Sequence, residues 1–150
     1  MLKKKLEDDL KSAMRAGEAL KVSVLRMLLS AVSNKEIEIL KKETGLTDEE
    51  TIEVLSRELK KRKDSAREFK KGARNELAEK EEKEAEIISK YLPEEISNED
   101  LERIVAESVR EANGKSTADF GRVMKAAMAV LKGRASGDRV SDEVKRSLNA

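Results

Sequence analysis

Apolar side chains recur at steps of three and four residues along nearly the whole chain, which is the spacing that one face of an α-helix requires. Near the N-terminus, for example, Leu2, Leu6, Leu10 and Met14 follow one another at steps of four. No alternating apolar and polar stretch of useful length appears anywhere in the sequence, so strands are not expected. The sequence therefore predicts an all-α fold.

Capping and breaking residues divide this pattern into seven predicted helices. The first four are expected over residues 2–16, 20–42, 48–71 and 73–91, with a capping box formed by Thr47 and Glu50 before the third. The last three are expected to begin after Ser97, Ser116 and Ser141, with stops at Asn113-Gly114 and Gly133. In the second helix Leu25, Leu28, Leu29 and Val32, then Ile39 and Leu40, form the apolar face, and Asn34, Lys35, Glu36 and Glu38 are assigned to other faces.

Pro93 is the only proline, and it marks a natural division of the chain. Proline has no amide hydrogen and disfavours a helical residue before it, so a helix is expected to stop here. We predict two helical subdomains: residues 1–92 with about four helices, and residues 93–150 with a three-helix bundle.

The side chains that most enzyme mechanisms use are missing, because the chain contains no Cys and no His. This excludes disulfides, thiol or imidazole catalysis, and zinc sites built from those residues. Five glutamates crowd the fourth predicted helix: Glu79, Glu81, Glu82, Glu84 and Glu86. They lack the His ligands of helical di-iron sites. We expect a non-catalytic protein with no metal, no cofactor and no small-molecule substrate.

Hydropathy and aromatic content restrict the partners further. No run approaches the roughly 20 apolar residues of a membrane span, and the N-terminal MLKKKLEDDL has no apolar core of signal-peptide length. We therefore expect a cytoplasmic protein with no membrane partner. Aromatic residues make up only 2% of the chain, so base stacking has few platforms. Tyr91 and Phe120 are interpreted as anchors in the core or between the subdomains.

The net charge is only +1, yet charge is sorted along the sequence. Between Arg57 and Arg74 lie nine basic and three acidic residues, whereas between Glu76 and Glu86 lie six glutamates and two lysines. Two interpretations are open. Either the two helices pack antiparallel and exchange surface ion pairs, or part of the basic helix faces outward and binds phosphates.

The stretch from Lys115 to Ala150 holds eight basic and four acidic residues. It includes Gly133-Arg134-Ala135-Ser136-Gly137, a small-residue loop where the backbone can approach a polyanion and Arg134 can bind phosphate oxygens. A solvated loop with two helix-terminating glycines explains the same residues.

Several ordered blocks of the sequence resemble the YqeY-like family. They are Leu25–Glu38 (LRMLLSAVSNKEIE), Arg57–Ser65 (RELKKRKDS), Leu77–Glu81 (LAEKE), Tyr91-Leu92-Pro93, Gly121–Lys125 (GRVMK) and Gly133-Arg134-Ala135. The resemblance covers essentially the whole chain and implies two all-helical subdomains. In that family, a homologous domain forms the C-terminal tail of the B subunit of the tRNA-dependent Asn/Gln amidotransferase, where it helps to hold the body of the tRNA.

The resemblance implies a module that binds tRNA or a tRNA-handling protein, and it does not imply catalysis, because it concerns the tail and not the catalytic domain. By likeness to the amidotransferase tail, the first expected contacts to RNA phosphates are Lys125, Lys132 and Arg134, with Arg122 behind them. A second group comprises Arg57, Lys61, Arg62 and Arg74. Since Arg62 lies on the apolar seam of its helix, a buried pair with a glutamate is the alternative for that residue.

Two other functions stay open. One is a protein-interaction adaptor that binds no RNA and uses the apolar and acidic faces of the helix around Leu77 to Tyr91. The other is carbon–nitrogen ligase activity, with glutamine as the amido donor, expressed only as part of a complex.

Overall fold

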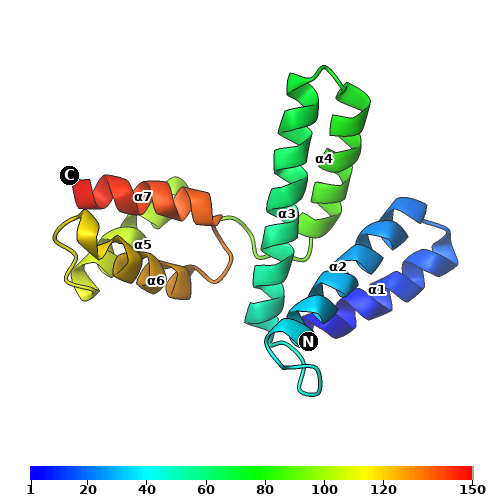
Figure 1. Cartoon of the computed structure of the whole chain (residues 1–150), viewed down its shortest axis with the longest axis horizontal. Coiled ribbons are helices and arrows are strands. Elements are labelled where there is room, and N and C mark those ends of the chain that lie inside the picture. Colours follow the sequence, from blue (N-terminus) through cyan, green and yellow to red (C-terminus); the bar gives the residue numbers. More distant parts are fainter. Residues whose placement is uncertain (150) are drawn as a thin grey trace. The chain divides into compact units, whose positions relative to one another are not determined.

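A computed structural model gives the structure of the protein and describes residues 1–149. Within this range the chain forms seven α-helices and one short 3-10 helix, with no strand (Figure 1). In chain order the elements are α1 (Leu2–Ala16), α2 (Ala19–Glu38), α3 (Asp48–Lys71), α4 (Asn75–Ser89), α5 (Asn98–Glu111), η1 (Thr117–Asp119), α6 (Phe120–Leu131) and α7 (Gly137–Asn149). The predicted all-α fold is confirmed.

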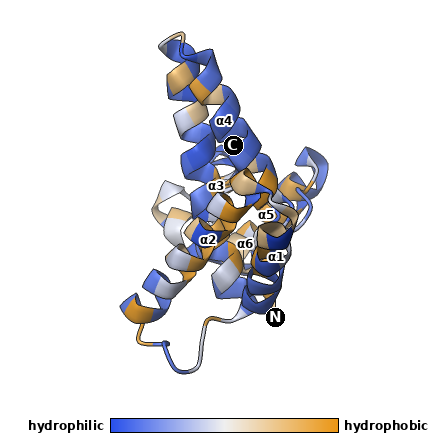
Figure 2. Cartoon of the chain, turned by 90° about the vertical axis from the view of Figure 1, so that its right-hand side faces the viewer, coloured by the Kyte–Doolittle hydropathy of each residue, from blue (hydrophilic) through white to orange (hydrophobic). Residues whose placement is uncertain are grey.

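The chain divides into two compact units, an N-terminal unit (Met1–Leu92) and a C-terminal unit that starts at Pro93. Each unit has its own hydrophobic core. Figure 2 shows blue and orange alternating along the helical ribbons, the pattern of amphipathic helices that bury one face.

The N-terminal unit consists of two helical hairpins, α1 with α2 and α3 with α4 (Figure 1). Helix α2 also packs against α3 and α4, so it joins the hairpins. The largest fully buried side chains of this unit are Leu6, Leu25, Leu28, Leu55 and Ile88. They come from all four helices, so packing between the hairpins, not helix propensity alone, stabilises this unit.

Local sequence chemistry explains where α1 ends and α3 begins. Gly17 follows α1 with φ +69°, a left-handed conformation that glycine adopts without a side-chain clash. The Thr47 hydroxyl accepts a hydrogen bond from the Glu50 amide at 3.1 Å, and the Glu50 carboxylate accepts one from the Thr47 amide at 2.9 Å. The predicted capping box is therefore confirmed.

The prediction for the C-terminal end of α2 was wrong. The helix ends at Glu38, not near residue 42, and Leu40 takes φ +58° with its side chain 92% exposed. The Lys41 amide donates to the Glu36 carbonyl at 2.7 Å, a bond that closes the helix. Helical spacing continues in the sequence past a point where the backbone has already turned away, and Leu46 supplies the buried side chain instead.

The C-terminal unit packs α5, α6 and α7 around a core that includes Val105, Val123, Leu131, Val140 and Val144. Ser97 caps α5 as predicted, since its hydroxyl accepts from the Asp100 amide at 3.2 Å. The prediction that Ser141 opens the last helix was wrong, because α7 already begins at Gly137. The Ser136 hydroxyl instead accepts from the Arg139 amide at 3.2 Å.

Candidate nucleic-acid interface

The oppositely charged helices α3 and α4 pack together as an antiparallel hairpin. Lys70 of α3 forms an ion pair with Glu82 of α4. Arg62 of α3 lies between Glu81 and Glu84 of α4, with its Nε 3.7 Å and 3.2 Å from their Oε2 atoms. The interpretation that these helices exchange ion pairs is confirmed, and it accounts for part of their sorted charge.

Three of the four α3–α4 candidates for phosphate contacts lie in ion pairs. Arg57 pairs with Glu53 at 3.0 Å and Lys61 with Glu58 at 3.2 Å, both exposed contacts within α3. The Arg62 side chain is only 21% exposed and faces glutamates, so the alternative predicted for it, a buried structural pair, is what the structure shows.

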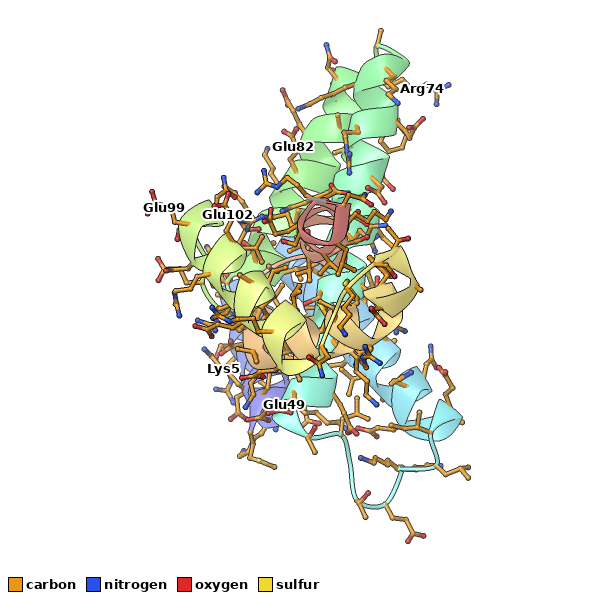
Figure 3. All side chains as sticks on the ribbon, turned by 90° about the vertical axis from the view of Figure 1, so that its left-hand side faces the viewer. Lys5, Glu49, Arg74, Glu82, Glu99 and Glu102 are labelled. Atoms are coloured by element: carbon orange, nitrogen blue, oxygen red, sulfur yellow. The ribbon has the colours of Figure 1, made fainter. Side chains whose placement is uncertain are left out.

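Arg74 lies apart from these three residues. It precedes α4 at the end of the hairpin, where its side chain projects into solvent (Figure 3). Residues 71–77 are all exposed, and Arg74 forms no ion pair within the described part of the chain. Of the second group of candidates, Arg74 is therefore the cation most accessible to a polyanion.

The first group of candidates gathers on and beside α6. Six exposed residues share one side of this helix and its C-terminal cap, and we call them the α6 face: Gly121, Arg122, Lys125, Met128, Ala129 and Lys132. Helix α6 contains no Asp or Glu. The face therefore combines three cations with Gly121, Met128 and Ala129. Apart from the neighbouring residues and the backbone of the helix itself, no heavy atom lies within 4 Å of the position where a Gly121 Cβ would stand. Positive charge on an exposed helix face is the feature by which proteins neutralise phosphates.

The cations of the α6 face differ in how they are held. Lys125 is exposed and forms no ion pair or hydrogen bond among residues 1–149. Lys132 is exposed in a left-handed conformation, φ +46°, at the end of the helix. Arg122 pairs with Asp119 at 2.9 Å. Hydrogen bonds from the Lys115 and Ser116 amides, together with Arg122, lower the pKa of that carboxyl, so the pair is ionised near neutral pH.

Arg134 caps the C-terminal end of α6, a role that its sequence context did not indicate. Its Nε donates to the Leu131 carbonyl at 3.2 Å, and a terminal nitrogen donates to the Val130 carbonyl at 3.4 Å. The side chain is half-buried and caps the last turn of α6. The guanidinium keeps unused donors, but its orientation is fixed by α6.

The loop between α6 and α7 is held to the rest of the C-terminal unit by a buried side chain and a backbone hydrogen bond. Gly133 adopts φ +83° directly after α6, Ala135 is 5% exposed, and the Arg134 carbonyl accepts from the Ile96 amide at 2.8 Å. These contacts tie the loop to the segment before α5. They fix the position of Lys132 relative to the core, which favours a preformed surface over a mobile loop.

Charge is unevenly distributed within the C-terminal unit. The exposed side of α5 carries several carboxylates: Glu99 projects into solvent in Figure 3, and Glu102 is exposed but pairs with Arg146 at 2.9 Å. Helix α5 holds five acidic and two basic residues, in contrast with the carboxylate-free α6. The α6 face is therefore the more positive of these two exposed sides of the C-terminal unit.

The two aromatic residues singled out above are held in place. The Tyr91 hydroxyl donates to Asp9 Oδ2 at 2.5 Å, and burial, with the Asp9 carboxylate next, raises the pKa of the phenol. Phe120 packs on the core of the C-terminal unit, and the Lys145 ammonium lies 5.8 Å from its ring centre. Their role as core anchors is confirmed, and neither ring presents an open stacking platform.

Among residues 1–149, no group of three or more acidic, His or Cys residues is arranged to hold a metal ion. The five glutamates of α4 are used otherwise: Glu82 pairs with Lys70, while Glu81 and Glu84 face Arg62. None of the helices in residues 1–149 is long and apolar enough to cross a bilayer.

Comparison with known proteins shows what this chain is similar to. A family model described as Yqey-like protein matches residues 3–148. A protein named "Altered inheritance of mitochondria protein 41, mitochondrial" is 39% identical over 90 residues in Candida glabrata, covering 59% of this chain and 48% of the relative. Its namesake in Clavispora lusitaniae is 42% identical over 87 residues, 58% of this chain and 49% of that protein. The chain thus matches only about half the length of these relatives, whose names place them in mitochondria.

Proposed function

The chain belongs to the Yqey-like protein family, and from this premise we propose that it is a non-catalytic helical module that binds tRNA through the α6 face. The observation that carries the proposal is the α6 face itself: Arg122, Lys125 and Lys132 share one exposed side of a helix without carboxylates. The resemblance of Gly121–Lys125 and Gly133-Arg134-Ala135 to the tRNA-holding tail of an amidotransferase subunit supports the same surface.

The chemistry of the face indicates how the RNA is recognised. Aromatic stacking is not offered, so base-by-base recognition of a single strand lacks its usual platform. Cations beside Gly121 and Ala129 suit the sugar–phosphate backbone of a folded RNA, whose A-form helices present a wide, shallow minor groove. We therefore propose recognition of tRNA by shape and backbone charge, with Arg74 as a further contact.

The variant that tests the proposal reverses two charges on the α6 face, Lys125→Glu with Lys132→Glu. We expect affinity for total tRNA to fall about tenfold or more at low salt. The slope of log K against log salt should also decrease in magnitude by about 2, because two phosphate contacts are lost. Filter binding over a salt series measures both quantities. Arg134 is left intact because its replacement would also remove the cap of α6.

A matched control carries the same change of net charge elsewhere. Lys11→Glu with Lys42→Glu reverses two exposed lysines of the N-terminal unit that belong to neither group of candidates. We expect this control to bind tRNA nearly as the unmodified chain does. Equal losses in the two double variants would show that only net charge matters, and unchanged binding by the α6 variant would refute the assignment.

We propose that the chain has no catalytic activity of its own, on the ground that its sequence lacks Cys and His. Ammonia release from glutamine, assayed with and without charged tRNA, is expected to show no turnover. A tRNA-handling protein remains the second partner that the family resemblance suggests. It is distinguished from RNA by complex formation that survives nuclease treatment. The cytoplasm stays our prediction for this chain, although the yeast relatives are named as mitochondrial.

A further inference from the structure

One guanidinium lies among three carboxylates where α3 packs on α4. Arg62 Nε is 3.2 Å from Glu84 Oε2 and 3.7 Å from Glu81 Oε2, and a terminal nitrogen of Arg62 is 3.9 Å from Glu58 Oε2. The three glutamate side chains are between 13% and 19% exposed. We call these four residues the Arg62 cluster. With all groups ionised, its charge is −2, since three carboxylates surround one cation.

The surroundings of the cluster compensate this charge only partly. From α3, Lys61 pairs with Glu58 at 3.2 Å from the solvent side. From α4, Lys80 lies near enough to act on Glu81, as does the Glu84 carboxylate. From α2, the contact is the uncharged sulfur of Met27, which touches the Arg62 guanidinium. Glu81 therefore faces one carboxylate and two cations, and Arg62 is shared among three carboxylates.

Two polar atoms in the cluster are buried without a hydrogen-bond partner, Arg62 Nε and Glu81 Oε2. A buried polar atom left unpaired is costly, and few such atoms persist in folded proteins. A proton taken from solvent by Glu81 removes part of this cost: the resulting carboxylic acid can donate a hydrogen bond to the Glu84 carboxylate. Glu84 then still faces Arg62, and the cluster charge falls from −2 to −1.

We propose that the Arg62 cluster is a proton-operated clamp, in which protonation of Glu81 tightens the packing of α4 against α3 and its loss loosens the hairpin. This goes beyond tRNA binding, because the cluster lies in the N-terminal unit, whereas the α6 face that carries the tRNA proposal lies in the C-terminal unit.

The direction of the pH dependence follows from the environment of Glu81. Burial, followed by the Glu84 carboxylate, raises the pKa of the Glu81 carboxyl above its ordinary value of 4.5. The folded state therefore binds more protons than the unfolded state between 4.5 and the raised pKa. In that window stability increases as pH falls. Asp48 and Glu50 act in the opposite direction, but their pKa values are lowered, so their contribution is lost only in more acidic solution.

The test compares the unmodified chain with Glu81→Gln and with Glu79→Gln. Glu79 is an exposed glutamate of the same helix, so its replacement makes the same chemical change outside the cluster. The readouts are amide hydrogen exchange in α3 and α4, and the carboxyl carbon signal of Glu81, followed from pH 7.5 to pH 5. Intrinsic amide exchange itself depends on pH, so the measured rates are corrected for it. For the unmodified chain and for Glu79→Gln, we expect the corrected exchange rates in α3 and α4 to fall severalfold as pH falls. The Glu81 signal should titrate above the ordinary glutamate pKa of 4.5.

Glu81→Gln mimics the protonated side chain. We expect it to show, already at pH 7.5, the slow exchange that the unmodified chain reaches at lower pH when Glu81 is protonated, and to lose the pH response. Two results would overturn the proposal: a Glu81 signal that titrates at or below the ordinary value of 4.5, or a Glu81→Gln variant that keeps the full pH response. A tRNA affinity unchanged by Glu81→Gln is expected, whereas failure of tRNA binding in the unmodified chain would count against the proposed function alone.

Discussion

Lys3→Ala is expected to lower the free energy of unfolding of the N-terminal unit by about 3 kcal/mol. The Lys3 Nζ lies 2.7 Å from Glu36 Oε1, and the Glu36 side chain is only 5% exposed. Without Lys3, this carboxylate stays buried on α2 and keeps no other ion pair among residues 1–149. An unpaired buried charge costs several kcal/mol, far more than the loss of a surface ion pair.

The adjacent residue offers a matched control. Lys4 forms an ion pair with Asp8 at 3.4 Å, but both side chains are more than half exposed. Lys4→Ala removes the same side chain from the same helix and is expected to cost less than about 0.5 kcal/mol. Urea unfolding followed at amide signals of α1 and α2 separates the two outcomes. Similar losses in both variants would mean that helix propensity, not the buried pair, governs stability here.

A double replacement of Lys3 and Glu36 tests the cause directly. Lys3→Met with Glu36→Leu removes both charges and leaves apolar side chains of similar size. We expect it to recover most of the stability lost by Lys3→Ala, because no ion then remains buried. If the double variant is as unstable as the single one, the loss comes from packing and not from charge.

The buried pair also shows a limit of prediction from sequence. Helical periodicity identified the apolar stripe of α2 but assigned Glu36 to another face, and this was wrong, since Glu36 is 4% exposed. A helical wheel places Glu36 close to Leu25 and Val32, which is where a buried residue belongs. Because Glu36 is charged, it was nevertheless assigned to an exposed face. Only the packing of α1 on α2, which brings Lys3 to it, makes the position tenable for a carboxylate.

The candidate interface was predictable in part for similar reasons. Helical spacing alone places Arg122, Lys125 and Ala129 on one side of a helix, so their common face could be deduced from the sequence. The half-buried position of Arg62 followed from its place on the apolar seam. Arg134 could not be foreseen as a cap, because its orientation depends on the path of the chain after Gly133. Spacing fixes which side chains share a helix face, and it says nothing of a side chain in a loop.

Gly114→Ala is expected to destabilise the C-terminal unit by about 2 kcal/mol, because a methyl group has no room there. A Cβ on Gly114 would stand 2.9 Å from Val123 Cγ2, 3.1 Å from Leu148 Cδ2 and 3.3 Å from Val109 Cγ1. These atoms belong to α5, α6 and α7, so the segment after α5 closes tightly over one end of the bundle. The core of this unit is small, and a loss of this size is a large part of the stability of such a domain.

Gly121→Ala is the control, since it introduces the same methyl group on the exposed α6 face. Apart from the neighbouring residues and the backbone of the helix itself, no heavy atom lies within 4 Å of that Cβ position. Alanine also favours a helix over glycine by about 1 kcal/mol. We therefore expect the same added methyl group to have different effects on the Tm of the C-terminal unit. Gly114→Ala lowers this Tm, while Gly121→Ala leaves it unchanged or raises it. Because neither glycine is among the residues with positive φ, backbone strain does not enter the comparison. If both variants lose stability to a similar extent, an added methyl group destabilises this unit even where it has room. The close approach of side chains at Gly114 would then not explain the loss in Gly114→Ala.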